Sequence, residues 1–205
     1  HFGLDTLSFA RLGAKVTGVD FSSQAIIQAR RLSQEMNLSA KFICCDIYDL
    51  SETLAEQFDI DFTSYGVLCW LPDLKPWATL IESFLNPGGR FYIVEHHNLL
   101  GVFDNREDAS ELSISKTYFH SEIPVAYEDR GTYACRDDKT LYKGYEWRHG
   151  IGDVISVLSR AGLHIDFLNE FPYTSWQALP FLEQGRDGWW GLPSKIPELP
   201  LMFSL

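Results

Sequence analysis

The stretch 14–22, AKVTGVDFS, constrains the fold of this chain more than any other. It follows the helix-stop signal Leu12-Gly13, contains a short run of β-branched residues and ends in an acid, Asp20. This pattern predicts a buried parallel strand with a carboxylate at its end. At the carboxyl edge of an open α/β sheet, such a carboxylate can accept hydrogen bonds from both hydroxyls of a ribose. Asp20 could instead cap the next helix, and this stretch alone leaves both interpretations open.

The first half of the chain predicts a continuous alternation of helices and strands. Residues 2–12, 24–36 and 74–85 carry apolar residues at helical spacing, and 40–47, 58–67 and 90–94 have the composition of strands. Asp46 lies near the end of the second of these strand segments, which strengthens the case for a binding edge. Asp61 is out of place inside a buried strand, where an apolar residue is expected.

The chain begins with a helix that has no strand before it. In a βα alternation that helix should follow a strand, which would lie in the middle of the sheet. We therefore expect the chain to be cut at its amino end, so that the first strand and any glycine-rich loop precede His1.

Residues 98–149 interrupt the alternation with a block rich in aromatic residues, interleaved with charges and turn residues. Segments such as 132–135 alternate like strands, which favours a small antiparallel piece. We expect this block to be an inserted cap over the sheet edge. It could serve as a substrate lid, or as a packing flap or dimer contact.

The residues after 149 are again predicted to form helices and strands. We expect a helix over 151–161, a strand over 163–171 and a long ordered loop over 172–200 held by Trp176, Trp189 and Trp190. The last apolar run, 201–205, follows a proline and could form an edge strand. The length and the 45% hydrophobic content favour a single domain over 1–205.

The composition limits the classes of partner that this chain is expected to bind. The formal net charge of -11 argues against nucleic acid or an anionic membrane and favours a small molecule. The four cysteines show neither metal-ligand spacing nor a disulfide framework, so we expect no metal site and a reducing, cytoplasmic compartment. No apolar run reaches the length of a membrane span. A homodimer is possible.

Four segments in order, GVDFS, ICCDIYDL, FDIDFTSYGVLCWLPDL and LNPGGRFYIVE, resemble the class I S-adenosylmethionine-dependent methyltransferases that act on small molecules. The resemblance covers residues 1–97 well and continues more loosely through AGLHIDFLNEF and PLMFSL. It implies a Rossmann-like, doubly wound and mostly parallel α/β sheet with an antiparallel last strand. It also implies S-adenosylmethionine as cofactor, with methyl transfer to a small organic acceptor by in-line attack.

The resemblance assigns cofactor contacts to particular residues. Asp20 would hold the ribose hydroxyls with Phe21 against the adenine, and Asp46 would accept from the adenine amino group with Ile47 on the ring. The methionine end would be lined by Ser64, Tyr65 and Gly66, and His1 would directly follow the glycine-rich loop.

A general base is needed only when the acceptor arrives protonated, and imidazole titrates in the right range. The candidates are His96, His97, His120 and His149. We rank His97 first as the catalytic residue because it lies just past the end of a strand. The acceptor would be bound by residues of the inserted block and its end: Tyr118, His120, Tyr145, Trp147 and His149.

Two other functions fit part of the pattern. A nicotinamide-dependent Rossmann oxidoreductase also uses an acid at a strand end, but Asp46 and the Pro87-Gly88-Gly89 turn fit it poorly. A methyltransferase-like protein that binds the cofactor without turnover is the non-enzymatic alternative.

Overall fold

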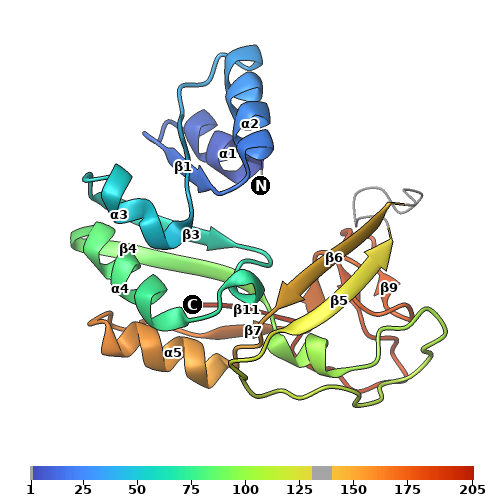
Figure 1. Cartoon of the computed structure of the whole chain (residues 1–205). Helices are drawn as coiled ribbons and strands as arrows, with labels where there is room; N and C mark the ends of the chain where they lie inside the picture. Colours follow the sequence, from blue (N-terminus) through green and yellow to red (C-terminus); the bar gives the residue numbers. More distant parts are fainter. Residues whose placement is uncertain (1, 131–139) are drawn as a thin grey trace. The chain divides into compact units, whose positions relative to one another are not determined.

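The structure, a computed structural model, describes residues 2–130 and 140–205, so His1 and the segment 132–135 lie outside the described residues (Figure 1). The chain divides into two compact units, His1–Glu56 and Gln57–Leu205, and the single domain expected over 1–205 stays a prediction. The strands account for this division. Among the described residues, the strands of the first unit pair only with each other, and the strands of the second unit pair only among themselves.

The first unit consists of two βα repeats. Its elements are α1 (Leu4–Arg11), β1 (Thr17–Asp20), α2 (Ser23–Glu35), β2 (Lys41–Cys44), η1 (Ile47–Asp49) and α3 (Leu50–Thr53). β1 pairs parallel with β2, and Asp20 is opposite Cys44. The apolar stripes of α1 and α2 supply Leu7, Ile26 and Ala29, which bury Phe42 of β2 in a common core. The helices and strands predicted here are confirmed, and the strands are shorter than expected.

The second unit is built on a four-stranded sheet of order β3-β4-β11-β7. Its strands are β3 (Phe58–Ser64), β4 (Leu85–His96), β7 (Asn169–Phe171) and β11 (Met202–Ser204). β3 and β4 are parallel, and β11 is antiparallel to both of its neighbours. The predicted antiparallel last strand is therefore confirmed. Our expectation that it lies at an edge is wrong, because residues 201–205 are buried and apolar enough to lie inside the sheet.

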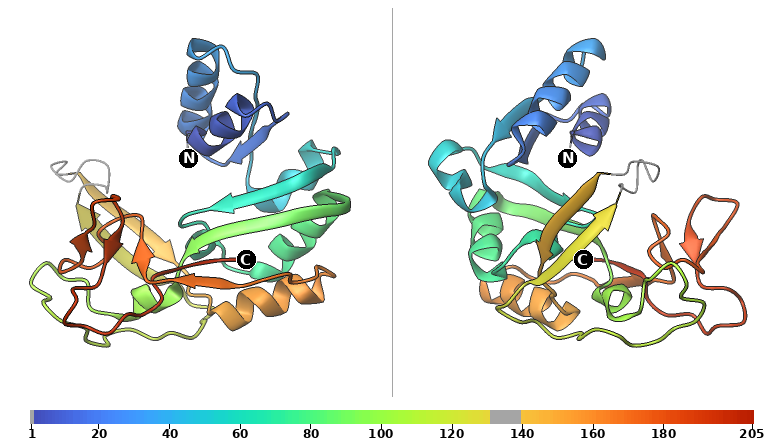
Figure 2. Two further views of the ribbon diagram at one scale, coloured as in Figure 1. Left: turned by 180° about the vertical axis from the view of Figure 1, so that it is seen from behind. Right: turned by 45° about the vertical axis from the view of Figure 1, so that its right-hand side comes forward.

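Two helices cover one face of this sheet. α4 (Leu74–Phe84) packs against β3, β4 and α5 (Ile151–Arg160), as the two views of Figure 2 show. Trp77 of α4 meets Phe91 of β4 edge to face, with ring centroids 5.6 Å apart. Asp61 pairs in register with Phe91, so its side chain is on this helix-covered face.

The other segments of the second unit form short elements. The inserted block contains η3 (Asn98–Val102) and an antiparallel hairpin of β5 (Val125–Arg130) and β6 (Leu141–Glu146), which confirms the small antiparallel piece. η2 (Leu68–Trp70) follows β3 closely. The segment 172–200 is not simply a loop, because β8 (Tyr173–Thr174), β9 (Glu183–Gln184) and β10 (Trp190–Gly191) form a small antiparallel sheet.

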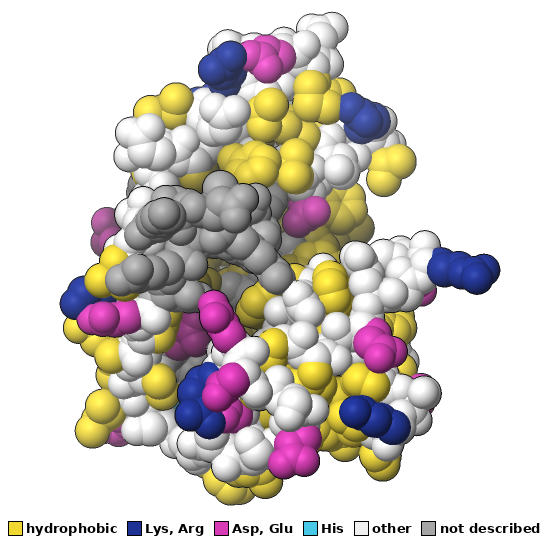
Figure 3. Space-filling view, turned by 90° about the vertical axis from the view of Figure 1, so that its right-hand side faces the viewer, with side chains coloured by type: hydrophobic (Ala, Val, Ile, Leu, Met, Phe, Trp, Pro, Cys, Tyr) yellow, Lys and Arg dark blue, Asp and Glu magenta, His cyan; other side chains and the backbone are white. Residues whose placement is uncertain are grey.

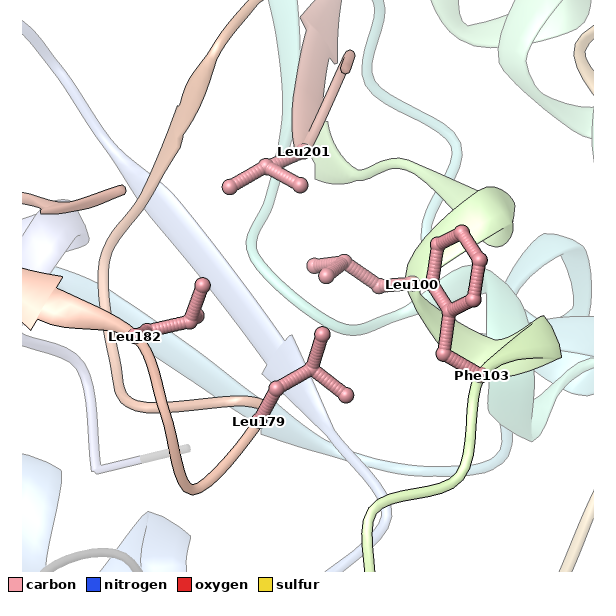
Figure 4. Packing of buried hydrophobic residues seen from close by; sticks show 5 residues of the cluster. All are labelled: Leu100, Phe103, Leu179, Leu182 and Leu201. Atoms are coloured by element: carbon pink, nitrogen blue, oxygen red, sulfur yellow. The ribbon is translucent and has the colours of Figure 1, made fainter. Parts of the chain in front are cut away.

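A separate hydrophobic cluster anchors the inserted block. Leu100 and Phe103 of the η3 region meet Leu179, Leu182 and Leu201, and Figure 4 shows these side chains converging. The start of the block and the segment before β11 thus share one core. This core fixes both to the end of the sheet.

The surface shows no concentration of positive charge on the face drawn in Figure 3, where the Lys and Arg side chains of the described residues stand apart from one another. Among the described residues, no helix is both long and apolar enough to cross a membrane.

Candidate functional site

In the first unit, four residues predicted to bind the cofactor lie at one edge of the β1-β2 pair. Asp20 ends β1, Phe21 follows it, and Asp46 and Ile47 come directly after β2. Because β1 and β2 are parallel and in register, these residues share the carboxyl edge. The Phe21 side chain is 77% exposed, an unusual state for a phenylalanine ring.

The two carboxylates have different local roles. Asp20 Oδ1 accepts from the backbone N–H of Ser22 at 2.8 Å, but the N-cap of α2 is Ser22, whose hydroxyl accepts from Ala25. Asp20 is therefore not the helix cap. Asp46 is a cap, because it is the N-cap of η1 and its Oδ1 accepts from Tyr48 N–H at 3.0 Å.

In the second unit, the chain leaves β3 through a tight turn at the three residues predicted to line the methionine end. Tyr65 has φ 44 and Gly66 has φ 85, so both lie in the left-handed region. This conformation costs a tyrosine energy that a glycine does not incur. The Tyr65 N–H donates to Val94 O at 2.8 Å, which ties the turn to β4.

The buried carboxylate of Glu95 accepts hydrogen bonds from the backbone of this turn. Glu95 accepts the backbone N–H groups of Gly66, of Val67 at 2.7 Å and of Leu68 at 3.2 Å. It also accepts from the N–H of His96 at 2.7 Å. A buried charge is stable only when it is well hydrogen-bonded, and these four donors meet that need. Glu95 therefore fixes the backbone on which Tyr65 and Gly66 are presented.

His96, the last residue of β4, lies beside the same turn. Its ring centroid is 6.2 Å from that of Tyr65 and 6.2 Å from that of Trp176. Its Nε2 is 3.0 Å from the hydroxyl oxygen of Ser175. Burial lowers the pKa of His96 from its ordinary value, while the charge of Glu95 acts in the opposite direction. The side chain is 23% exposed, so it is still accessible to a small molecule.

His97, which we ranked first as catalytic residue, is held in a structural arrangement. It is the N-cap of η3, and its Nδ1 accepts from Leu99 N–H at 3.0 Å. Its Nε2 therefore carries the proton and donates to Glu170 at 3.0 Å. With both nitrogens engaged and only 5% of the residue exposed, His97 is not arranged to take a proton from an acceptor. Burial also lowers its pKa.

Three of the predicted acceptor-binding residues lie together at the start of α5. The Tyr118 hydroxyl accepts from Ile151 N–H at 3.3 Å. The rings of His120 and His149 stack with centroids 4.7 Å apart. Nε2 of His149 donates to Leu71 O at 2.7 Å, and burial lowers the pKa of His149. These contacts are structural, although His120 is exposed.

The other two predicted acceptor-binding residues belong to the hairpin. Tyr145 is 61% exposed on β6. Trp147 donates its backbone N–H to Cys69 O of η2 at 2.8 Å. Trp70 of η2 also contacts Tyr127 of β5, with ring centroids 6.3 Å apart. The hairpin thus lies against η2, which follows directly on the turn at Tyr65 and Gly66.

Sequence reasoning missed three residues of this site: Glu95, Ser175 and Trp176. Consecutive residues of a strand point to opposite faces, so the run Glu95-His96-His97 had to place His96 on one face and its two neighbours on the other. This alternation is the sequence signal that separates His96 from Glu95 and His97. Ser175 and Trp176 join the site only through the fold, and no local pattern marks them.

A comparison with protein families and with known proteins adds to this geometry. Residues 2–93 match the family model described as "Methyltransferase domain". Over 90 residues the chain is 32% identical to a "Ubiquinone biosynthesis O-methyltransferase" of Coxiella burnetii (strain Dugway 5J108-111). The match covers 44% of this chain and only 38% of that protein.

Solved structures match nearly the whole chain. A putative S-adenosylmethionine-dependent methyltransferase from Listeria monocytogenes aligns with a TM-score of 0.61 at 13% identity, covering 99% of this chain and 83% of that one. The glycopeptide N-methyltransferase MtfA, complexed with S-adenosylmethionine, aligns with a TM-score of 0.53 at 14% identity, covering 97% and 74%. At these identities the similarity establishes the fold.

Proposed function

We propose that this chain, which matches the methyltransferase family model over residues 2–93 and has the Rossmann-like fold of solved S-adenosylmethionine-dependent methyltransferases, transfers a methyl group from S-adenosylmethionine to a small organic acceptor. One observation in each unit supports the proposal. In the first unit, the described residues predicted to bind the cofactor lie at or just after the carboxyl ends of β1 and β2, and in the second unit those predicted to line its methionine end lie at the carboxyl end of β3. In open α/β sheets this is where ligands bind.

The residues of the first unit suit the adenosine part of the donor. The Asp20 carboxylate is an acceptor for ribose hydroxyls, and Asp46 is an acceptor for the adenine amino group. The exposed ring of Phe21 and the side chain of Ile47 provide apolar surface for the base. In the second unit, we assign the amino-acid end of the donor to the turn at Tyr65 and Gly66, where the Tyr65 side chain is exposed.

The chemistry required of the protein is modest. The donor supplies an already activated methyl group on a sulfonium. The residues of this chain have to bind donor and acceptor in line, which in favourable intramolecular cases lowers the barrier by on the order of 7 to 11 kcal/mol. Aromatic side chains such as Tyr65 and Trp176 can exclude water from the acceptor.

For the acceptor, we propose a hydroxyl group on a small, largely apolar molecule. The relative from Coxiella burnetii is named an O-methyltransferase of ubiquinone biosynthesis, which supports oxygen as the methylated atom. The net charge of -11 and the half-exposed aromatic rings beside His96 are consistent with a neutral aromatic acceptor.

Calorimetry and a transfer assay test the proposal. Titration with S-adenosylhomocysteine should give saturable binding, and titration with NADH should give none. Incubation with radiolabelled S-adenosylmethionine and a panel of phenols and catechols should yield labelled ether. Binding of NADH alone would favour an oxidoreductase. Binding of S-adenosylhomocysteine without transfer to any acceptor would favour a protein that has lost turnover.

A further inference from the structure

We propose that His96 is the general base of this site and that Ser175 positions its ring. This inference rests on the proposed methyl transfer to a hydroxyl group. His96 comes from the end of β4 and Ser175 from the segment after β8, so the pair is assembled by two distant parts of the chain.

The position of His96 carries the argument. Its Nδ1 lies 3.8 Å from the point where a Cβ on Gly66 would stand, so the ring faces the turn predicted to line the methionine end. The rings of Tyr65 and Trp176 each lie 6.2 Å from it, centroid to centroid, and both residues are about 40% exposed. A hydroxyl-bearing aromatic molecule that packs on these rings would bring its oxygen close to the imidazole.

The hydrogen bonds select the nitrogen that accepts the proton. Nε2 is 3.0 Å from the Ser175 hydroxyl oxygen, so the tautomer with hydrogen on Nε2 donates to Ser175 and holds the ring in place. Nδ1 is then the basic atom, and it is the nitrogen that faces the turn at Gly66. Nδ1 also lies 3.8 Å from Glu95 Oε1, so the proton that it takes up is next to a carboxylate. A general base must lie within hydrogen-bond distance of the proton that it removes.

The charges around His96 agree with this role. Glu95 on its own strand is the acidic group that faces it, Tyr65 faces it from the turn after β3, and Ser175 and Trp176 add no charge. Burial lowers the pKa of the imidazole, so His96 is neutral and able to accept a proton at neutral pH. The nearby Glu95 carboxylate stabilises the imidazolium once it forms.

In the transfer step, the acceptor oxygen forms a bond to the methyl carbon while the carbon–sulfur bond breaks and its electron pair remains on sulfur. The hydroxyl proton passes to Nδ1 of His96, while Nε2 keeps its hydrogen bond to Ser175. The products are a methyl ether, a neutral thioether and a protonated imidazole, which releases its proton to solvent. No oxidant, reductant or metal is needed for this balance.

The test compares His96→Gln with His164→Gln, an exposed histidine outside this site. The probes are catechol and 4-nitrocatechol, because the nitro group makes the hydroxyl more acidic. We expect His96→Gln to lower kcat with catechol by about 100-fold or more, the usual contribution of a general base. With 4-nitrocatechol, which arrives largely ionised, the loss should be much smaller. His164→Gln should match the parent with both probes.

Further measurements distinguish a failure of the His96 proposal from a failure of the proposed function. The acid limb of the kcat–pH profile should disappear in His96→Gln, while S-adenosylhomocysteine affinity by calorimetry should stay within about twofold. Ser175→Ala should lower kcat by less than tenfold and keep the limb. If the parent transfers methyl but His96→Gln keeps its kcat and its pH profile, His96 is not the base. If the parent transfers no methyl to either probe or to any other phenol or catechol of the panel, the proposed function itself is overturned.

Discussion

Glu95 Oε2 lies 2.7 Å from the backbone nitrogen of Val67, so a carboxylate buried at the end of β4 fixes the turn that leaves β3. The same carboxylate holds the N–H groups of Gly66 and Leu68. Two neighbouring strands are thereby locked together at the edge where the candidate site lies. The left-handed backbone of Tyr65 is maintained by this arrangement.

Replacing Glu95 by glutamine should therefore destabilise the protein and loosen the turn. An amide has one acceptor oxygen, and its NH₂ group cannot accept from N–H donors. Each backbone donor left unpaired should cost about 1 to 3 kcal/mol. Urea unfolding measures the loss, and faster hydrogen exchange at Gly66 and Val67 locates it. Glu183→Gln, on an exposed strand, is the control and should change stability by less than about 0.5 kcal/mol.

The side chain of Asp61 should give the stability of the protein an unusual pH dependence. It lies on the helix-covered face of β3, and burial raises its pKa from 3.8 to about 6. Between these two values the folded state binds more protons than the unfolded state, so this group lowers stability as pH rises through that window. Asp61→Asn removes the effect. The variant should be more stable than the parent at pH 7 by up to about 3 kcal/mol, with no gain below pH 4.

Urea unfolding of both proteins at a series of pH values checks this expectation. Asp59→Asn, an exposed position on the same strand, serves as the control for loss of one charge. A gain for Asp61→Asn that is equal at pH 4 and pH 7 would contradict the proton linkage and point to packing instead.

Asp20→Ala should weaken S-adenosylhomocysteine binding more than tenfold without unfolding the protein. Loss of hydrogen bonds between a charged group and a ligand costs about 1.5 to 3 kcal/mol. Because Ser22 is the N-cap of α2, removing Asp20 leaves the helix capped. Glu52→Ala removes the same charge from an exposed position in the same unit and should leave affinity unchanged. Equal affinity of Asp20→Ala and the parent by calorimetry would refute the ribose assignment.

Local pattern predicted most of the elements because helical spacing and β-branched runs are local properties. α2, α4 and α5 begin and end within two residues of their predicted bounds. The partners of a strand are not local. The run 201–205 gave no sign that it would insert between β4 and β7, and the small sheet in 172–200 depends on residues brought together by the Leu100 and Leu179 cluster.

The sequence could not separate the adjacent histidines for a related reason. His96 and His97 are adjacent in sequence, and the strand end alone does not say which one is enclosed. The structure turns His97 toward Glu170 and the η3 cap, and it turns His96 toward Ser175. Proximity to the end of a strand was a weaker guide than the alternation of side chains along it.

Replacing Tyr145 tests whether the inserted block is a substrate lid or a contact between two copies of the chain. Tyr145 is 61% exposed, so Tyr145→Ala should change stability by less than about 0.5 kcal/mol. If the hairpin closes over the acceptor, this variant should raise the acceptor's KM or lower turnover several-fold, with S-adenosylhomocysteine affinity unchanged. Leu12→Ala, 83% exposed in the other unit, is the matched control and should behave as the parent.

The alternative is a contact between two copies of the chain, for which exposed tyrosines are also well suited. Size exclusion of parent and variant separates the two roles. If Tyr145→Ala keeps full activity and runs as a monomer where the parent runs as a dimer, the hairpin is an interface and the lid is wrong. Reduced acceptor affinity with no change in elution supports the lid, because the hairpin contacts η2 beside the turn at Tyr65 and Gly66.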